Sequence, residues 1–251
     1  MSHQSLRVLD LTRPTPEENL ALDEALLNEA ESAADKVDPQ KESRASDHEL
    51  LRLWSPTSLA VILGRHSKVQ EEVNLDYCQR QGIPILRRMS GGATVLIGPG
   101  CLMYSVLLSY DARPDLRELS VAHDFVLGRL ASVISGATTC GTSDLVIGNR
   151  KFSGNALRCR RNYLLYHGTL LYEFPLEKIE SALRMPPRAP DYRNGRSHKE
   201  FLANLSATQA EIRQALIAAF DADKIQESWP VHHVAKLVAE RYAKRDWTYA
   251  R

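Results

Sequence analysis

Glycine, proline and serine divide this chain into short apolar runs, and this division constrains the fold most strongly. Residues 50–109 and 138–172 become segments with the length and composition of β-strands. Around them lie segments whose apolar residues recur at helical spacing. Short strands mixed with helices predict an α/β (α+β type) domain with a mixed, mostly antiparallel sheet flanked by helices.

The positions of the expected elements follow from local signals. Thr15, Pro16 and Glu18 predict a helix start with a capping box. The other expected helices are Asp115–Ser135, Ala207–Phe220 and Val231–Tyr242, and the expected strands include Leu6–Leu11, Leu50–Trp54, Leu59–Leu63, Ile83–Leu86 and Leu102–Leu108. Residues 33–47 are charged and contain Pro39, which predicts a flexible loop within one domain spanning residues 1–251.

Charge and cysteine content exclude several classes of protein. Lys and Arg number 32 against 31 Asp and Glu, and a net charge of +1 argues against nucleic acid as the main partner. No apolar run is long enough for a membrane span and the N-terminus has no apolar signal core, so we expect a cytoplasmic protein. The scattered Cys78, Cys101, Cys140 and Cys159 predict neither a zinc site nor a disulfide framework.

The segment Arg87–Gly100 combines two arginines with a Ser-Gly-Gly turn. Such a turn can present several backbone N–H groups to one anion, and arginine adds charged donors that suit a phosphate or carboxylate. A glycine-rich hairpin with two solvated arginines is the alternative interpretation. The segment contains neither a P-loop nor a Rossmann pattern.

The segment Gly141–Arg158 places Asp144 and Lys151 on either side of a predicted hairpin turn at Gly148-Asn149. This arrangement can bring a carboxylate and an ammonium group to one ligand. The carboxylate suits Mg²⁺, and the ammonium suits a phosphate or a developing negative charge. A surface Asp/Lys hairpin is the alternative, and His167 further along could be a structural histidine.

Taken together and in this order, these segments resemble the lipoate–protein ligase A family of the biotin/lipoyl ligase and octanoyltransferase fold group. The family's Arg-Arg-x-Ser-Gly-Gly-Gly loop is similar to residues 87–93, and its Arg-Lys-x-Ser-Gly-x-Ala-x-Arg segment is similar to residues 150–158. Its His-Gly-Thr-Leu-Leu is similar to residues 167–171, with support from residues 19–24 and 63–66. The resemblance implies a class II biotinyl/lipoyl ligase-like catalytic domain.

The resemblance also implies an activity. Such ligases use ATP with Mg²⁺ to convert lipoate or octanoate to an acyl-adenylate. They then acylate a lysine on a lipoyl domain of a 2-oxoacid dehydrogenase or on a glycine-cleavage carrier protein. By position, Lys151 would touch the carboxyl and the phosphate, while Asp144 would hold Mg²⁺ or orient the acceptor lysine. The implied contacts to lipoyl-adenylate or ATP are Arg88, Ser90, Gly91, Gly92, Ala93, Thr94, Val95, Leu96, Lys151, Ser153, Gly154 and Asn155, with His167, Arg158 and Cys140 as further candidates.

Four features depart from the ligase pattern. Ala93 replaces the third glycine of the loop, Ile97 stands where the family usually has His, and Ser143 stands where it commonly has Asn. Gly98-Pro99-Gly100 is similar to the octanoyltransferases instead. The resemblance ends near Trp247, so we expect no C-terminal accessory domain like that of the two-domain ligases. A partner subunit that supplies this domain is a further hypothesis.

An ATP-independent octanoyl or lipoyl transferase is the main alternative. Such a transferase needs a thiolate nucleophile. One variety of these transferases has its cysteine within the stretch that corresponds to Met185–Ser197, which contains no Cys here. A second variety has its cysteine shortly before the Asp–Lys hairpin, and Cys140 lies close to that position. A buried structural cysteine is the alternative interpretation of Cys140, and we favour it over a nucleophile. A biotin ligase matches the motifs less well, and a non-catalytic member of the fold is a further hypothesis. We favour the ligase.

Two arginine-rich stretches lie at the end of these motifs or beyond them. The cluster Arg158–Arg161 predicts a strand that faces solvent or an acidic lipoyl domain rather than nucleic acid. Arginines also recur through the proline-rich stretch that follows, and we expect them to stay solvated or to pack over the site; they are Arg184, Arg188, Arg193 and Arg196.

Overall fold

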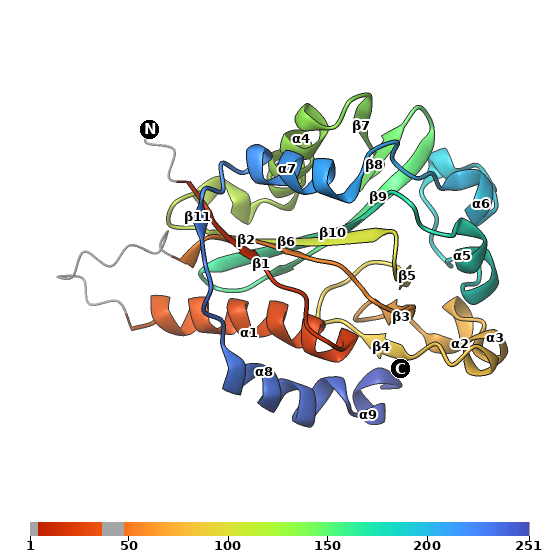
Figure 1. The fold of residues 1–251 in the computed structure, drawn as a ribbon, viewed down its shortest axis with the longest axis horizontal. Coiled ribbons are helices and arrows are strands. Elements are labelled where there is room, and N and C mark those ends of the chain that lie inside the picture. The colour runs from red at the N-terminus through yellow and green to blue at the C-terminus, as the bar shows by residue number, and fades with distance from the viewer. Residues whose placement is uncertain (1–4, 37–47, 251) are drawn as a thin grey trace.

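The computed structural model describes residues 5–36 and 48–250 (Figure 1). Its largest element is an eight-stranded sheet with the order β11-β1-β2-β6-β10-β9-β8-β7. These strands are β1 (Arg7–Asp10), β2 (Leu50–Trp54), β6 (Cys101–Ser109), β7 (Ala137–Cys140), β8 (Asp144–Ile147), β9 (Arg150–Cys159), β10 (Tyr163–Leu171) and β11 (Lys224–Ile225). A smaller sheet has the order β4-β3-β5, with β3 at Ala60–Leu63, β4 at Ile85–Arg87 and β5 at Val95–Ile97.

Most strand pairs of the two sheets taken together are antiparallel. The exceptions are β1, which runs parallel to β2 and β11, and β3, which runs parallel to β4. The longest pair joins β6 to β10, with Ser109 opposite Tyr163 and Cys101 opposite Leu171. The predicted mixed, mostly antiparallel sheet is therefore confirmed.

Helices cover both faces of the large sheet (Figure 1). One face carries α1 (Pro16–Ala34), α8 (Val231–Leu237) and α9 (Arg245–Thr248), and the other carries α4 (Leu119–Val133) and α7 (Gln209–Ala219). A separate apolar cluster lies under each layer. The remaining helical elements are α2 (Val69–Glu72), α3 (Leu75–Arg80), η2 (Pro114–Arg117), α5 (Leu176–Ala182), η3 (Asp191–Arg193), α6 (His198–Phe201) and η4 (Val238–Tyr242).

The start of α1 follows the predicted capping chemistry. The Thr15 side chain accepts from the backbone N–H of Glu18, and the Glu18 carboxylate accepts from the backbone N–H of Thr15. Pro16 stands at the first helical position, where its missing N–H leaves no bond unmade. This part of the prediction is confirmed.

Other boundaries differ from the prediction. The helix expected from Asp115 begins as the 3₁₀ turn η2, which starts at Pro114, and α4 starts only at Leu119. The helix expected over Val231–Tyr242 ends in the π-helical turn η4. The loop expected from residue 33 starts too early, because Ala33 and Ala34 belong to α1; residues 37–47 lie outside the described part of the chain.

A buried ion pair joins α1 to the large sheet. Arg52 on β2 is fully buried and donates to Asp23 of α1 at 2.5 Å and to the Asn19 side chain at 2.7 Å. Ser105 on β6 donates to the same Asp23 carboxylate at 2.9 Å. Burial alone would raise the pKa of Asp23, but Arg52 and His167 outweigh it and the pKa is lowered. Asp23 is therefore held as an anion within the fold.

In the two described ranges, no helix has the length and apolar content that a membrane crossing requires.

Candidate active site

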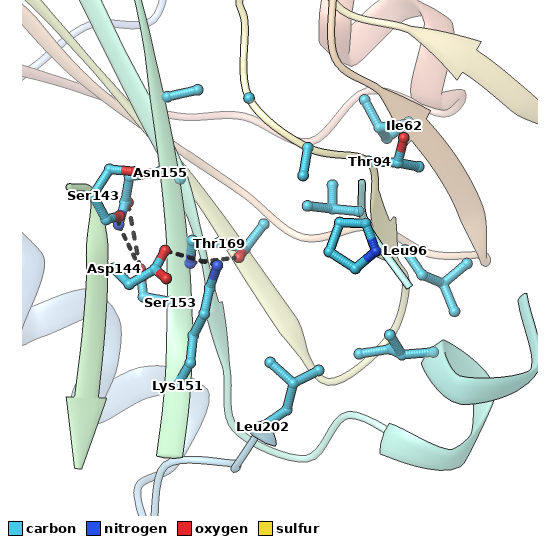
Figure 2. Close-up of a pocket in the computed structure, with 18 of the residues that line it drawn as sticks. Ile62, Thr94, Leu96, Ser143, Asp144, Lys151, Ser153, Asn155, Thr169 and Leu202 are labelled. Atoms are coloured by element: carbon cyan, nitrogen blue, oxygen red, sulfur yellow. Dashed lines mark hydrogen bonds and ion pairs between the residues drawn. The ribbon is translucent and has the colours of Figure 1, made fainter. Parts of the chain in front are cut away.

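A cavity of about 400 Å³ lies between the β8–β9 hairpin and the segment that leads into β5. Figure 2 shows Asp144 and Lys151 on one side of it and Thr94 and Leu96 on the other. Much of its wall is apolar, including Ile62, Val95, Leu96, Met103, Phe152, Leu183 and Leu202. Two sequence segments more than 40 residues apart thus face one space, which is large enough for a small organic ligand.

The hairpin holds the ion pair that its sequence predicts. Lys151 Nζ lies 2.7 Å from Asp144 Oδ1, and both side chains are mostly buried. The turn between the two strands is at Gly148-Asn149, as expected, and the register shifts between Leu145 and Val146. The Tyr192 hydroxyl donates to the second oxygen, Asp144 Oδ2, at 2.7 Å. Lys151 therefore presents its charge at the cavity wall from a fixed position.

The side chain of Arg88 braces the glycine loop, which we define as residues 88–94. Its Nε donates to Ser90 Oγ at 3.0 Å, and its terminal nitrogens donate to the carbonyls of Ile62, Gly91 and Ala93. Burial lowers the pKa of Arg88 to about 10, which still leaves it charged at neutral pH. Arg88 also lines the cavity, and its contact with a nucleotide stays a prediction.

Arg87 points away from the cavity. Its guanidinium donates to the carbonyls of Gly64 at 2.7 Å and Ser67 at 2.8 Å, and it reaches the carbonyl of Thr248 on α9 at 2.8 Å. Both arginines of the motif are buried, so the interpretation of this segment as a hairpin with solvated arginines is wrong. Their charges hold backbone carbonyls in place.

The glycine loop packs tightly against the segment that follows β3. A Cβ atom on Gly64 would lie 1.8 Å from the Gly92 carbonyl oxygen, and Gly92 has a φ of +86°. In the described part of the chain, positive φ outside glycine occurs only at Asn194 and Asp221. The backbone at Ala93 is therefore compatible with alanine, which explains how the chain departs from a third glycine there without strain.

Ser90 connects the loop to the buried ion pair of α1. His167 Nε2 lies 2.6 Å from Ser90 Oγ, and His167 Nδ1 lies 3.7 Å from Asp23 Oδ2. Ser90 is 1% exposed and does not line the cavity, whereas His167 and Asp23 do. His167 therefore connects Asp23 of α1 to Ser90 of the glycine loop, and its role in a reaction stays a prediction.

Polar side chains at the hairpin end of the cavity form hydrogen bonds with one another. Asn155 donates to the Ser143 carbonyl at 2.8 Å and accepts from the Tyr104 hydroxyl at 2.6 Å. Ser153 Oγ lies 3.1 Å from the Asn155 amide nitrogen. On the opposite wall, the Thr94 backbone N–H and hydroxyl both donate to Glu72 Oε2, at 2.9 and 2.8 Å. These contacts fix the shape of both walls.

The structure brings most of the predicted site residues to this cavity. Arg88, Gly92, Ala93, Thr94, Val95, Leu96, Asp144, Lys151, Ser153, Gly154, Asn155 and His167 line it. Ser90, Gly91, Arg158 and Cys140 do not. Sequence reasoning missed Glu72 and Tyr192, because each meets its partner from a distant segment that carries no repeating pattern.

Cys140 lies beside the hairpin but outside the cavity. It stands opposite Asp144 in the β7–β8 register and is half-buried, one strand further from Lys151 than Asp144 is. The other cysteines are less suited to catalysis. Cys78 and Cys101 are buried, and burial raises the pKa of the Cys101 thiol to about 12; Cys159 is exposed at the far end of β9.

The arginines of the proline-rich stretch are divided. Arg184 and Arg188 are exposed at the cavity wall. Arg193 is only 3% exposed, lines the cavity and lies over the Phe201 ring at 4.8 Å, so of the two expected placements it takes the one at the site. At the other end of β9, Arg160 and Arg161 are exposed, as expected for a solvated strand end.

A family model identifies this architecture. The model of the lipoyl protein ligase A/B catalytic domain matches residues 15–221. The chain belongs to this family. The match includes the glycine loop, the hairpin with Lys151 and Asp144, and His167, so the family resemblance expected from the motifs is confirmed.

Curated relatives include both activities that the motifs suggest. Lipoate-protein ligase LplJ of Bacillus subtilis is 27% identical over 209 residues, which cover 76% of this chain and 62% of the relative. Octanoyltransferase LipM of Carboxydothermus hydrogenoformans is 25% identical and covers 98% of this chain and 99% of the relative. The chain therefore spans less than two thirds of the ligase but the whole length of the transferase.

Solved structures share the fold. A putative lipoate protein ligase from T. acidophilum with bound lipoic acid has a TM-score of 0.76 and 22% identity, covering 99% of this chain and 100% of the other. A lipoate-protein ligase A bound with ATP has a TM-score of 0.73 and 23% identity, covering 98% and 99%. The predicted class II lipoyl ligase-like fold is confirmed.

The contact between Gly64 and Gly92 leads to a stability prediction. We expect Gly64→Ala to lower the free energy of unfolding by about 1–3 kcal/mol, because the added methyl group must displace the glycine loop backbone. Gly128→Ala is the control: Gly128 is exposed within α4 and a Cβ there meets nothing within 4 Å. It should raise the free energy by roughly 0.5–1 kcal/mol in the same urea titrations. Equal effects of the two changes would contradict the close approach.

Proposed function

We propose that this chain is an enzyme that activates lipoate or octanoate with ATP and transfers the acyl group to a lysine of a carrier protein. The observation that carries the proposal is the placement of the Lys151 ammonium opposite the glycine loop across one largely apolar cavity. An acyl chain has apolar walls to lie against, and its carboxyl end has a fixed cation beside it.

Lys151 supports both half-reactions. In the first, the lipoate carboxylate attacks the α-phosphorus of ATP and pyrophosphate leaves. In the second, the carrier amine attacks the acyl carbon, its proton is lost and AMP leaves. Negative charge develops beside the same carbon in each step, and a positioned ammonium in a buried site stabilises that charge. Asp144 holds this ammonium in place.

Magnesium would enter with the nucleotide rather than as a resident metal. In the described ranges, no three His, Cys, Asp or Glu side chains are grouped as a metal site, and both Asp144 oxygens already accept from Lys151 or Tyr192. Mg²⁺ in nucleotide sites binds mainly to phosphates and water, with one or two carboxylates. Asp144, the ligand that the motifs suggest, would have to exchange one of these contacts to bind the ion, which would neutralise phosphate charge.

The partners we propose are lipoyl domains of 2-oxoacid dehydrogenases or a glycine-cleavage carrier protein. A chain from the structural study of a bi-partite lipoate protein ligase and its E2 lipoyl domain from Thermoplasma acidophilum shares the fold at a TM-score of 0.74. Lipoate-protein ligase A subunit 1 of the same species is 27% identical to this chain over 175 residues. These relatives support a carrier domain as acceptor and a second subunit as an accessory partner.

An ATP-independent transferase is the second candidate. Its support is the full-length match to an octanoyltransferase together with the position of Cys140 opposite Asp144. In that reaction Cys140 would take the acyl group as a thioester and pass it to the carrier lysine. The ligase is favoured because Cys140 lies outside the cavity.

Intact mass of an apo lipoyl domain distinguishes the two candidates. The domain is incubated with this chain and free lipoate, with and without Mg-ATP, and in parallel with an octanoyl-loaded acyl carrier protein. A lipoyl-sized gain that requires ATP supports the ligase. Transfer from the loaded carrier without ATP supports the transferase, and no gain with any donor contradicts both for this chain alone.

Removing the ammonium of Lys151 should abolish acyl transfer. We expect Lys151→Ala to reduce the rate by at least about 100-fold, because the developing charge loses its stabilising partner. Carrier acylation measured by mass provides the test. Lys236→Ala, an exposed lysine on α8, is the control and should keep the full rate. Near-normal turnover by Lys151→Ala would refute the assignment.

Cys140→Ser separates the mechanisms. The change keeps the side-chain size and removes the nucleophilic thiol, so ATP-dependent acylation should stay within about twofold of the wild-type rate while any thioester route would be lost. The same mass assay is used with each acyl donor. Loss of all transfer by Cys140→Ser in a folded protein would overturn the ligase in favour of the second candidate.

The exposed arginines at the end of β9 should affect the acceptor step alone. Reversing Arg160 and Arg161 to Glu is expected to slow carrier acylation severalfold at low salt, since lipoyl domains are typically acidic. Lipoate-dependent pyrophosphate release without acceptor should not change. Reversal of Lys224 and Lys236, both exposed, changes the net charge equally and is the control. Equal losses in both half-reactions would exclude a docking role.

A further inference from the structure

We propose that Tyr192 is a positioning residue for the proposed acyl transfer: its hydroxyl holds Asp144 so that the Lys151 ammonium faces the acyl carbon. This inference rests on the proposed function. Tyr192 lies 48 residues from Asp144, in a proline-rich stretch with no helical or strand pattern, and its hydroxyl reaches Asp144 Oδ2 at 2.7 Å.

Each oxygen of Asp144 has its own donor. Lys151 Nζ lies 2.7 Å from Oδ1 and the Tyr192 hydroxyl lies 2.7 Å from Oδ2. Two donors on opposite oxygens set the rotation of the carboxylate plane. Without the hydroxyl, the carboxylate is free to turn and to draw the ammonium away from the ligand. The geometry of Lys151 therefore depends on both contacts.

The turn that carries Tyr192 is held by its own neighbours. Arg196 donates to the Tyr192 carbonyl at 2.8 Å and to the Arg193 carbonyl at 3.0 Å, and Arg193 donates back to the Arg196 carbonyl at 2.9 Å. The Tyr192 ring packs on Phe201 with 5.1 Å between centroids. The hydroxyl is thus presented from a braced element.

Tyr192 remains a hydrogen-bond donor at working pH. Burial and the neighbouring Asp144 both raise the pKa of its phenol. The residue does not line the cavity, so its hydroxyl has no direct contact with a ligand there. Its effect should therefore fall on the rate of transfer and leave substrate binding unchanged.

The test is Tyr192→Phe, which removes one oxygen and keeps the ring on Phe201. We expect kcat for carrier acylation to fall about tenfold, the order expected for one lost hydrogen bond to a charged group. The KM for the acyl substrate should stay within twofold, and the melting temperature within a few degrees. Tyr77→Phe is the control, because Tyr77 is half-buried on α3, away from the cavity.

A double-mutant cycle with Asp144→Asn separates positioning from structure. If Tyr192 acts through Asp144, adding Tyr192→Phe to Asp144→Asn should cause no further loss in single-turnover experiments. Three results would overturn this role. They are a double variant whose loss equals the product of the two single losses, a Tyr192→Phe variant with a changed KM and constant kcat, and a Tyr192→Phe variant with the wild-type kcat. The wild-type chain is assayed alongside: its failure to acylate from any donor would remove the proposed function, and this role with it.

Discussion

Buried guanidinium groups that donate to backbone carbonyls are the interaction on which the rest of the site depends. Arg87 ties the segment after β3 to α9, and Arg88 closes the glycine loop on itself. A buried guanidinium is costly unless hydrogen-bond acceptors surround it, because it has only donors. These hydrogen bonds therefore fix the backbone of the loop where it forms the cavity wall.

The opposite wall is fixed by side chains rather than by a loop. In the β8–β9 hairpin, Lys151 Nζ lies 2.7 Å from Asp144 Oδ1. The Tyr104 hydroxyl on β6 donates to the Asn155 side chain and so joins β9 to the large sheet. His167 and Asp23 connect the glycine loop to α1, which is itself anchored through the buried Arg52. Two hydrogen-bonded walls around an apolar space suit the proposed reaction, which needs a fixed cation beside an acyl carbon.

Local patterns in the sequence predicted the elements and the two walls. The capping box of Thr15, the turn at Gly148-Asn149 and the mostly antiparallel sheet follow from residues close together in the chain. The contacts between distant segments could not be predicted in this way. Arg87 meets Thr248 across 161 residues, and Tyr192 meets Asp144 across 48, from stretches without periodic apolar residues. Tertiary packing alone decides where such side chains point.

The mass of this chain itself tests the account most directly. Native mass spectrometry of the wild-type protein after incubation with lipoate and Mg-ATP, without acceptor, reports what the cavity holds. We predict a non-covalent gain equal to lipoyl-AMP that is lost on denaturation. The contradicting result has two parts. No adenylate is found in the sample with lipoate and Mg-ATP, and an acyl donor without ATP leaves a covalent acyl group on Cys140 that survives denaturation.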